Sequence, residues 1–270
     1  MKGIDISEFQ DDVDYDALKN NGIEFVIIRC GFGKNESQKD SCFEKHYSGC
    51  KNAGLKVGTY LYSYANTIAG ARLEAENCLR FINGKEFDLP VFYDVEDEDT
   101  TGTADPFTIT KMCETFCDII QNADYKAGVY ASLYWFNSKI YVDELIKKNY
   151  SIWLAQWNDT MDAEFHIDYW QYGKGYIEGI AGEVDLDKSY GEQPEPIPDP
   201  TYKIGIYQNG STKEPVYADT DLTTLIGVLG KQEMCECLGI YKNRAIVRYH
   251  VDGTKDNYKI GFVKWLGGVQ

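Results

Sequence analysis

The feature that most constrains the fold of this 270-residue chain is a proline-rich segment that follows residue 190. Residues 191–200 contain four of the seven prolines in the sequence. Alternating prolines cannot donate the hydrogen bonds of a helix or sheet, and they favour extended polyproline geometry. We therefore predict a semi-rigid linker over residues 191–201, about 30 Å long, between a large domain (1–190) and a small one (202–270). A proline-rich loop inside one domain is the alternative.

Charge is distributed unevenly between the two predicted domains. Residues 1–190 carry 18 Lys and Arg against 33 Asp and Glu, whereas residues 201–270 carry 9 against 7. The net charge of −16 argues against a nucleic-acid partner, because proteins that neutralise phosphates have a surplus of Lys and Arg. No apolar run is long enough to span a bilayer, and the first residues do not resemble a signal peptide. We therefore expect no membrane partner and a chain made in the cytoplasm.

The eight cysteines are few for a chain of this length and hydrophobic content, so we interpret them as mostly free thiols. Cys113 and Cys117 have helical spacing, and Cys235 and Cys237 have strand spacing. Only three histidines are available to complete a metal site of the Cys and His type. The sequence therefore predicts no metal site and no cofactor.

Short β-rich runs alternate with longer amphipathic runs before the linker, which is typical of α/β proteins. Eight such strands with intervening helices predict a compact (β/α) barrel. The length is short for that class, so some helices must be reduced, and the weak helical patterns after Ala131 place the reduction there. The predicted strands are 3–6, 25–30, 56–64, 90–95, 126–131, 151–156, 167–172 and 184–186, and the predicted helices are 14–20, 43–53, 69–82 and 109–122.

After the linker the pattern changes to short strands separated by turns. Asn209-Gly210 and Asp252-Gly253 are turn signals that are typical of hairpins. About seventy residues of this kind predict a small all-β barrel. Its predicted strands are 203–207, 216–217, 231–238, 244–251 and 259–265.

Two acidic residues end the fourth predicted strand. The strand period of two places Asp94 and Glu96 on one face, at the carboxyl end that carries function in (β/α) barrels. Carboxylates at this spacing lie roughly 6 Å apart, close to the separation of about 5–5.5 Å in retaining glycosidases. A close pair also raises the proton affinity of one member. The pair can therefore supply an acid and a stabilising anion.

The same acidic run has simpler interpretations. Asp97, Glu98 and Asp99 follow directly, so the segment could be a solvated loop or a calcium site. Two further acids favour catalysis, because Asp5 ends the first predicted strand and Asp185 lies in the last one. The first and last strands of a closed barrel are neighbours, so both side chains can reach a common pocket.

A series of motifs runs through residues 1–190 in a fixed order. The motifs are Gly3-Ile4-Asp5-Ile6-Ser7, 25–33, 57–65, Asp94-Val95-Glu96, Trp153-Leu154-Ala155-Gln156-Trp157, Tyr169-Trp170-Gln171-Tyr172 and Val184-Asp185-Leu186. Together they resemble the glycoside hydrolase family 25 lysozymes. The resemblance covers essentially the whole large domain and is far more specific than any single motif.

This resemblance implies a flattened, irregular (β/α) barrel with N-acetylmuramidase activity, which cuts the β-1,4 bond between N-acetylmuramic acid and N-acetylglucosamine in bacterial peptidoglycan. Glu96 then matches the general acid. Asp94 matches the acid that stabilises charge near C1 of the sugar or orients its 2-acetamido group. Asp5 and Asp185 match the flanking aspartates. An enzyme nucleophile and the acetamido group of the substrate are both open as mechanisms, and both predict retention of configuration.

Aromatic and amide side chains in the matching segments are the predicted sugar contacts. They are Tyr62, Tyr64, Trp153, Gln156 and Gln171, with Tyr62 and Gln171 favoured. Core packing is the alternative for each of them. We expect Arg29 to pair with buried carboxylates rather than to react.

The small domain has its own set of motifs. They are Val216-Tyr217-Ala218-Asp219, 225–229, 247–253 and 259–265. Over residues 203–268 they resemble the bacterial Src-homology-3-like wall-binding modules of lytic enzymes. The resemblance implies docking on a wall peptide or polymer, which raises the local concentration of the enzyme. Tyr207, Tyr217, Tyr249 and Trp265 are candidate contacts, with core packing as the alternative.

A chitinase of the family 18 type is the first alternative to a muramidase, because it is also a (β/α) barrel. It requires acids two and five residues before Asp94, where this chain has Phe92 and Leu89. A wall-binding protein with an inactive barrel is the second alternative, and the joint presence of the four carboxylates argues against it. A barrel with a wall anchor and no signal peptide is arranged like a phage or prophage endolysin that acts on the wall after release, with a host autolysin as the alternative.

Overall fold

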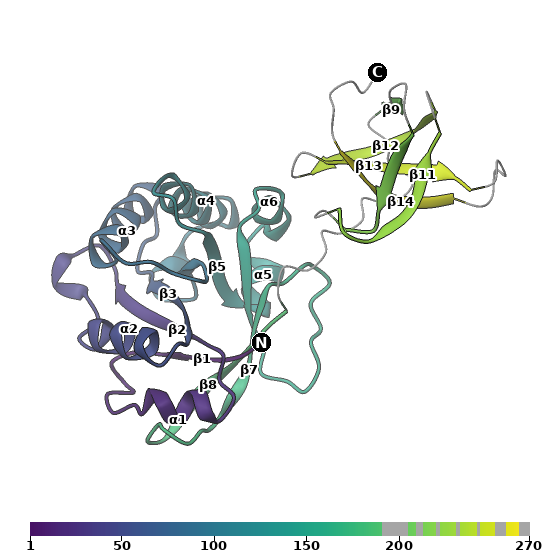
Figure 1. Ribbon diagram of the computed structural model, residues 1–270. Helices are drawn as coiled ribbons and strands as arrows, with labels where there is room; N and C mark the ends of the chain where they lie inside the picture. Colours follow the sequence, from purple (N-terminus) through teal and green to yellow (C-terminus); the bar gives the residue numbers. More distant parts are fainter. Residues whose placement is uncertain are drawn as a thin grey trace. The chain divides into compact units, whose positions relative to one another are not determined.

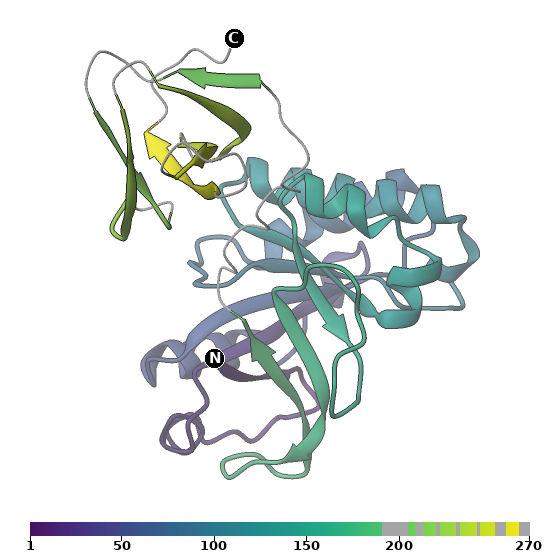
Figure 2. The ribbon, with the colours of Figure 1, turned by 90° about the vertical axis from the view of Figure 1, so that its right-hand side faces the viewer.

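The computed structural model describes residues 1–190 and the C-terminal ranges 205–208, 213–219, 222–230, 233–241, 244–251 and 258–264. The predicted linker at 191–201, both predicted turn dipeptides and Trp265 lie outside the described residues. The chain divides into two compact units, Met1–Gly191 and Glu192–Gln270. Each unit has its own sheet (Figures 1 and 2).

The N-terminal unit is built on a closed barrel of eight strands that are neighbours in sequence order. The strands are β1 (Lys2–Ile6), β2 (Phe25–Phe32), β3 (Lys56–Tyr62), β4 (Val91–Asp94), β5 (Ala127–Ser132), β6 (Ser151–Ala155), β7 (Tyr169–Tyr176) and β8 (Glu183–Ser189). All eight predicted strands are present, which confirms the predicted barrel. The largest difference in length is at β8, which spans Glu183–Ser189 where the sequence predicts a strand over 184–186.

The last strand departs from a regular (β/α) barrel. Strands β1 to β7 pair in parallel, whereas β8 runs antiparallel to both β7 and β1. Only residues 177–182 separate β7 from β8, and a parallel connection needs a dozen residues or more. The short connection therefore forces a hairpin, which is the irregularity of this barrel.

Helices cover the outside of the barrel, and the last two, α5 and α6, are short (Figure 1). They are α1 (Tyr15–Asn20), α2 (Phe43–Asn52), α3 (Ile68–Phe81), α4 (Pro106–Asn122), α5 (Leu133–Ser138) and α6 (Val142–Lys147), with two 3₁₀ turns, η1 (Glu36–Gln38) and η2 (Thr101–Thr103). The six-residue α5 and α6 confirm that helices are reduced after Ala131. Thr67 and Asp105 cap the long helices α3 and α4. No helix in the described part of the chain is long and apolar enough to cross a membrane.

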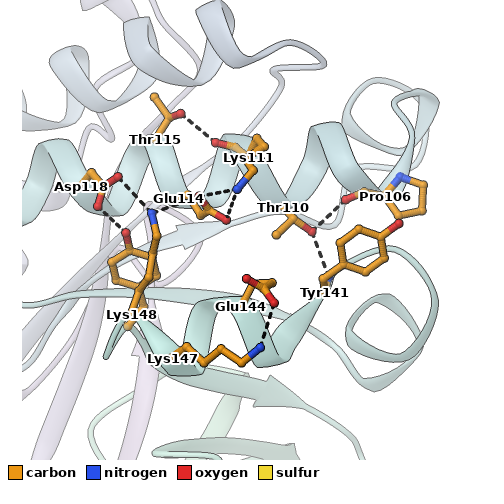
Figure 3. A network of polar contacts seen from close by, with 11 residues as sticks. Pro106, Thr110, Lys111, Glu114, Thr115, Asp118, Tyr141, Glu144, Lys147 and Lys148 are labelled. Carbon is orange, nitrogen blue, oxygen red and sulfur yellow. Dashed lines mark hydrogen bonds and ion pairs between the residues drawn. The ribbon is translucent and has the colours of Figure 1, made fainter.

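Polar contacts tie α6 to α4 on the outside of the barrel (Figure 3). Lys148, which directly follows α6, lies 3.0 Å from Glu114 and 3.4 Å from Asp118 of α4. The backbone N–H of Tyr141 also donates to the hydroxyl of Thr110 at 2.9 Å. Ion pairs with an exposed partner contribute about 0–1 kcal/mol each, so these contacts orient α6 more than they stabilise it.

Aromatic rings fill the interior of the barrel. Phe25, Phe92, Trp153 and Tyr169 belong to one buried cluster with Ile27, Leu89 and Tyr130. Two small residues make room for the rings: a Cβ on Gly3 would lie 2.3 Å from Phe25, and one on Gly128 would lie 2.6 Å from Phe92. Because inward positions recur every second residue, a polar layer follows this plug towards the carboxyl end. In that layer Asp5 follows Gly3, Asp94 follows Phe92 and Gln171 follows Tyr169.

The described residues of the C-terminal unit form a six-stranded antiparallel sheet in the order β11-β10-β14-β13-β12-β9. The strands are β9 (Gly205–Gln208), β10 (Glu214–Tyr217), β11 (Leu225–Leu229), β12 (Met234–Tyr241), β13 (Arg244–His250) and β14 (Tyr258–Lys264). Tyr207 and Tyr249 are only 2% and 6% exposed and belong to the core. The prediction of wall contacts is therefore wrong for these two residues, whereas Tyr217 is half-buried.

All eight cysteines have free thiols, and seven of them are buried. Burial raises the pKa of the Cys113 and Cys117 thiols, so both stay protonated and unreactive. These residues therefore act as small apolar side chains of the core, as the sequence predicts.

Candidate active site

Acidic side chains meet at the carboxyl end of the parallel strands. Asp5 of β1 and Asp185 of β8 are register partners in the ladder that closes the barrel. Asp94 ends β4 and pairs in register with Tyr62 of β3. Since β4 ends at Asp94, Glu96 lies in the following loop rather than on the strand face that its spacing predicts.

The four predicted carboxylates lie close enough to influence each other's ionisation. Burial first, and then the charge of Asp185, raise the pKa of Asp5 to about 7, while a hydrogen bond from Gln171 opposes them. Burial also raises the pKa of Asp94 well above its usual range, and the charges of Glu96 and Asp5 act in the same direction. The structure thus brings Asp5, Asp94, Glu96 and Asp185 into one cluster.

Glu96 is the member of this cluster best suited to donate a proton. Burial, followed by the charge of Asp185, raises the pKa of Glu96 above its ordinary value. A carboxyl group with a raised pKa keeps its proton closer to neutral pH and can act as a general acid. Glu96 is half-buried, whereas Asp94 is only 4% exposed. A large substrate can therefore reach Glu96 more easily than Asp94.

Three carboxyl oxygens of the cluster are buried with no hydrogen-bond partner among the described residues. They are Oδ1 of Asp94, Oδ1 of Asp185 and Oδ2 of Asp187. Buried polar atoms are nearly always paired, and the exceptions concentrate at sites that bind ligands or do chemistry. The three oxygens therefore mark the cluster as a place where a proton or a ligand donor is required.

Asp187 is a fifth carboxylate of the site that the sequence interpretation missed. It lies two residues after Asp185 on β8, is fully buried, and its Oδ1 accepts the indole N–H of Trp153 at 2.8 Å. Burial, and then the charge of Asp5, raise its pKa well above the usual range. The strand period of two from Asp185 was the available signal, because it places both acids on the same face.

Trp153 is a correction to the predicted sugar contacts. It is 1% exposed and packs against Phe92 and Tyr130 in the aromatic plug, with ring centroids 5.1 and 4.4 Å away. A side chain enclosed in this way has no surface open to a sugar. Its role is to hold Asp187 through the indole N–H, and the strand motif alone does not reveal which face of β6 points inward.

Gln171 connects three elements behind the carboxylates. Its amide donates to Asp5 Oδ2 at 2.9 Å, and its oxygen accepts from the Tyr130 hydroxyl at 3.1 Å and from the Trp157 indole at 3.0 Å. With 4% exposure, Gln171 positions Asp5. Gln156 instead bonds through both amide atoms to Asp162 in the β6–β7 loop, so it shapes that loop.

Tyr62 and Tyr64 line the end of β3 beside Asp94. Their rings lie 5.1 Å apart, and the Tyr62 hydroxyl donates to Asp97 Oδ2 at 3.2 Å. Tyr64 is 46% exposed and meets Phe32 edge to face. Both predicted residues therefore lie at the rim of the site, where exposed ring surface is available to a ligand.

The buried carboxylate of Glu74 accepts hydrogen bonds from residues behind this rim. Glu74 of α3 is 1% exposed and accepts from the Tyr93 hydroxyl at 2.6 Å, the Ser63 hydroxyl at 2.8 Å and the Tyr64 backbone N–H at 2.9 Å. Burial raises the pKa of Glu74, while the donors oppose this shift. The Ser63 backbone N–H in turn donates to the carbonyl of Asp94 at 2.9 Å. Glu74 therefore links the ends of β3 and β4, and the sequence interpretation did not identify it.

Arg29 pairs with carboxylates, as the sequence predicts. Its guanidinium lies 2.8 Å from the buried Asp40 and 2.9 Å from the half-exposed Glu8. The Phe9 ring stacks on the same group, with its centroid 5.1 Å from the guanidinium carbon. The positive charge of Arg29 also opposes the rise in the pKa of Asp94, so it limits the proton affinity of the cluster.

Asp97 and Glu98, which follow Glu96, accept hydrogen bonds from other residues of the protein. Asp97 accepts from the backbone and hydroxyl of Thr100, and these bonds lower its pKa. Glu98 accepts from the Trp135 indole and from Lys139. Within the described residues no group of three His, Cys, Asp or Glu could hold a metal ion. The contacts of Asp97 and Glu98 therefore favour a structured loop over the calcium site that the spacing alone leaves open.

The N-terminal unit has relatives among known proteins. Residues 4–180 match the family described as Glycosyl hydrolases family 25. The autolytic lysozyme of Clostridium acetobutylicum is 33% identical over 193 residues, which cover 70% of this chain and 55% of that protein. The match thus spans about half the length of this curated relative.

Two solved structures show the same fold. The CTP1L endolysin is 26% identical with a TM-score of 0.60, over 71% of this chain and 67% of that one. The autolysin LytC from Streptococcus pneumoniae, solved with a synthetic peptidoglycan ligand, is 25% identical with a TM-score of 0.61, over 69% of this chain and 46% of that one. With its closed barrel and carboxylate cluster, the chain belongs to family 25 of the glycosyl hydrolases.

Proposed function

We propose that this chain is a lysozyme that hydrolyses the β-1,4 bond between N-acetylmuramic acid and N-acetylglucosamine in bacterial peptidoglycan, with retention of configuration. The cluster of Asp5, Asp94, Glu96 and Asp185 at the carboxyl end of the barrel carries this proposal. The peptidoglycan ligand of LytC and the name of the Clostridium lysozyme support the substrate.

Glu96 protonates the glycosidic oxygen as its bond to C1 breaks. It is more exposed than Asp94 and its raised pKa preserves the proton. Positive charge develops at C1 and at the ring oxygen, where a neighbouring carboxylate stabilises it. Asp94, whose ionisation responds to the charge of Glu96, stabilises this charge or orients the 2-acetamido group. Asp5 and Asp185 flank the bond. Besides burial, the charge of Asp5 contributes to the raised pKa of Asp94, and the charge of Asp185 contributes to the raised pKa of Glu96.

Two routes complete the reaction, and both retain configuration. In one, an enzyme carboxylate attacks C1 and forms a covalent intermediate. In the other, the acetamido oxygen of the substrate attacks C1. Water then enters on the face of the departed sugar, and Glu96 accepts its proton. The test for retention is proton NMR of the first products, in which the β-anomer appears before mutarotation.

The C-terminal unit targets the enzyme to a wall peptide or polymer, as a Src-homology-3-like module would. The motif resemblance over residues 203–268 and the change to a positive net charge after residue 200 support this. Tethering raises the local concentration of the barrel at its polymeric substrate without changing the chemistry. We propose neither a nucleic acid nor a membrane as a partner.

The chain acts on the wall after release from the host cytoplasm, as an endolysin of phage or prophage type. Its similarity to the CTP1L endolysin supports this assignment. Its similarity to an autolytic lysozyme supports the alternative, a host autolysin. Lysis of wall suspensions by the protein added from outside, followed by turbidity, tests the wall activity that both share.

A further inference from the structure

Trp157 is an exposed aromatic residue at the edge of the carboxylate cluster. It follows β6 by two residues and therefore lies at the carboxyl end of the parallel strands. Its side chain is 59% exposed, although indole is the largest apolar side chain and is normally buried to a high degree. Exposure of this much indole beside a polar site requires an explanation.

Two contacts hold Trp157 in place, and each leads to one of the clustered carboxylates. The indole N–H donates to Gln171 at 3.0 Å, and Gln171 donates to Asp5 at 2.9 Å. The Lys174 ammonium lies 4.9 Å from the ring centroid and 3.7 Å from Asp185 Oδ1. The indole is thus fixed at its polar edge by one contact and on one face by the other.

These contacts decide which part of the ring is open. The N–H edge is engaged by Gln171 and one face is covered by Lys174. The 59% that is exposed therefore lies mainly on the opposite face and the outer edge. A fixed open aromatic face binds a flat apolar surface without paying the entropy of ordering a mobile side chain.

The surroundings select the chemistry of the ligand. The carboxylates of Asp5, Asp94, Glu96, Asp185 and Asp187 disfavour an anion at this position, and Lys174 already covers the cation-binding face. A pyranose ring is neutral and presents a face of C–H bonds, whose hydrogens carry partial positive charge. Such a face complements the negative face of an indole.

We propose that the open face of Trp157 is a stacking platform for one sugar ring of a polysaccharide strand that enters the carboxylate cluster. This inference rests on the proposed function and adds a defined binding position to it. Because Gln171 and Lys174 join the platform to Asp5 and Asp185, a ring stacked on Trp157 lies at the edge of the carboxylate cluster.

The test measures binding separately from cleavage. In the full chain carrying Glu96→Gln, isothermal titration with a peptidoglycan tetrasaccharide gives the Kd before and after Trp157→Ala. We expect Kd to rise about tenfold or more on loss of the ring, which corresponds to about 1.4 kcal/mol. Trp157→Phe keeps an aromatic face without the N–H donor, and its Kd should stay within about threefold of the parent value.

Phe107 provides a matched control. It is 57% exposed and has Lys111 at 5.7 Å from its ring centroid, but it lies on the outer helix α4. Phe107→Ala should leave Kd unchanged. An unchanged Kd in Trp157→Ala, with the circular dichroism spectrum preserved, overturns the platform. A chain with Glu96 intact that releases no new reducing ends, while Trp157→Ala still weakens binding, instead overturns the proposed hydrolysis and leaves the platform standing.

Discussion

Asp5 and Asp185 face each other across the β1–β8 ladder, at the seam where the barrel closes. Directly opposed residues have Cβ atoms about 4.5–5.5 Å apart, so two acids at this position disfavour joint ionisation. Asp187 lies on the same face of β8, two residues further along. The hairpin that makes this barrel irregular thus supplies two of its five clustered carboxylates.

Asp5 makes the stability of the barrel depend on pH. Its pKa rises from an ordinary value of 3.8 to about 7 on folding. A group with a raised pKa stabilises the folded state below its unfolded pKa, and this contribution is lost as the pH rises through the folded pKa. The side chain that Asp5→Asn introduces is neutral at every pH. The free energy of unfolding of this variant, relative to that of the parent, should therefore increase between pH 4 and pH 8, by on the order of a few kcal/mol.

Urea unfolding at both pH values measures this change. Asp12→Asn, at an exposed position, serves as the control and should follow the parent. Equal pH dependence of the parent and Asp5→Asn would show that Asp5 ionises normally in the folded protein.

Trp153 should matter for stability through its hydrogen bond to Asp187. Trp153→Phe keeps an aromatic ring in the plug but leaves Oδ1 of a fully buried carboxyl without its donor. A buried polar group that loses its partner costs about 1–3 kcal/mol. In a double-mutant cycle with Asp187→Ala, which removes the acceptor oxygen, the two changes should couple when measured by urea unfolding. Strictly additive effects would mean that the bond contributes nothing.

Glu74 should affect both stability and activity, because three donors converge on it below the active-site rim. Glu74→Gln replaces one acceptor oxygen with a donor, so at least one donor loses its partner, at a cost of about 1–3 kcal/mol. Loss of this link should displace the ends of β3 and β4, and this displacement should lower kcat/KM on wall fragments. Ser63→Ala removes only one donor and should have a smaller effect. If Glu74→Gln melts and cleaves like the parent, the link between Glu74 and the rim is absent.

The C-terminal unit should be needed for wall binding. The full chain with Glu96→Gln should pellet with purified cell walls, because it binds without digesting them. A chain that ends at Tyr190 should stay largely in the supernatant while still cleaving soluble glycan fragments. Equal pelleting of both chains would place wall binding in the barrel itself.

The positions of the strands and of Asp5, Asp94 and Asp185 could be predicted from the sequence, because strand periodicity fixes which residues share a face. Glu96 belongs to the predicted cluster, but it lies in the loop after β4 rather than on the strand. Barrel closure makes β1 and β8 neighbours, so Asp5 and Asp185 could be expected to lie near each other, and the structure pairs them in register. Periodicity does not reveal which face points inward, so the sequence predicts Trp153 as a sugar contact although it is buried. Asp187 and Glu74 act through partners that are distant in sequence, and only the folded chain brings these together.

The proposed cleavage is tested most directly by digestion of purified peptidoglycan, followed by borohydride reduction and mass spectrometry of the reduced sugar. We expect reduced muramic acid ends with the parent chain and none with Glu96→Gln, which keeps the shape of the acid but cannot donate its proton. Reduced glucosamine ends would contradict the proposed bond. No new reducing ends with the parent chain would make the protein a wall binder without catalysis.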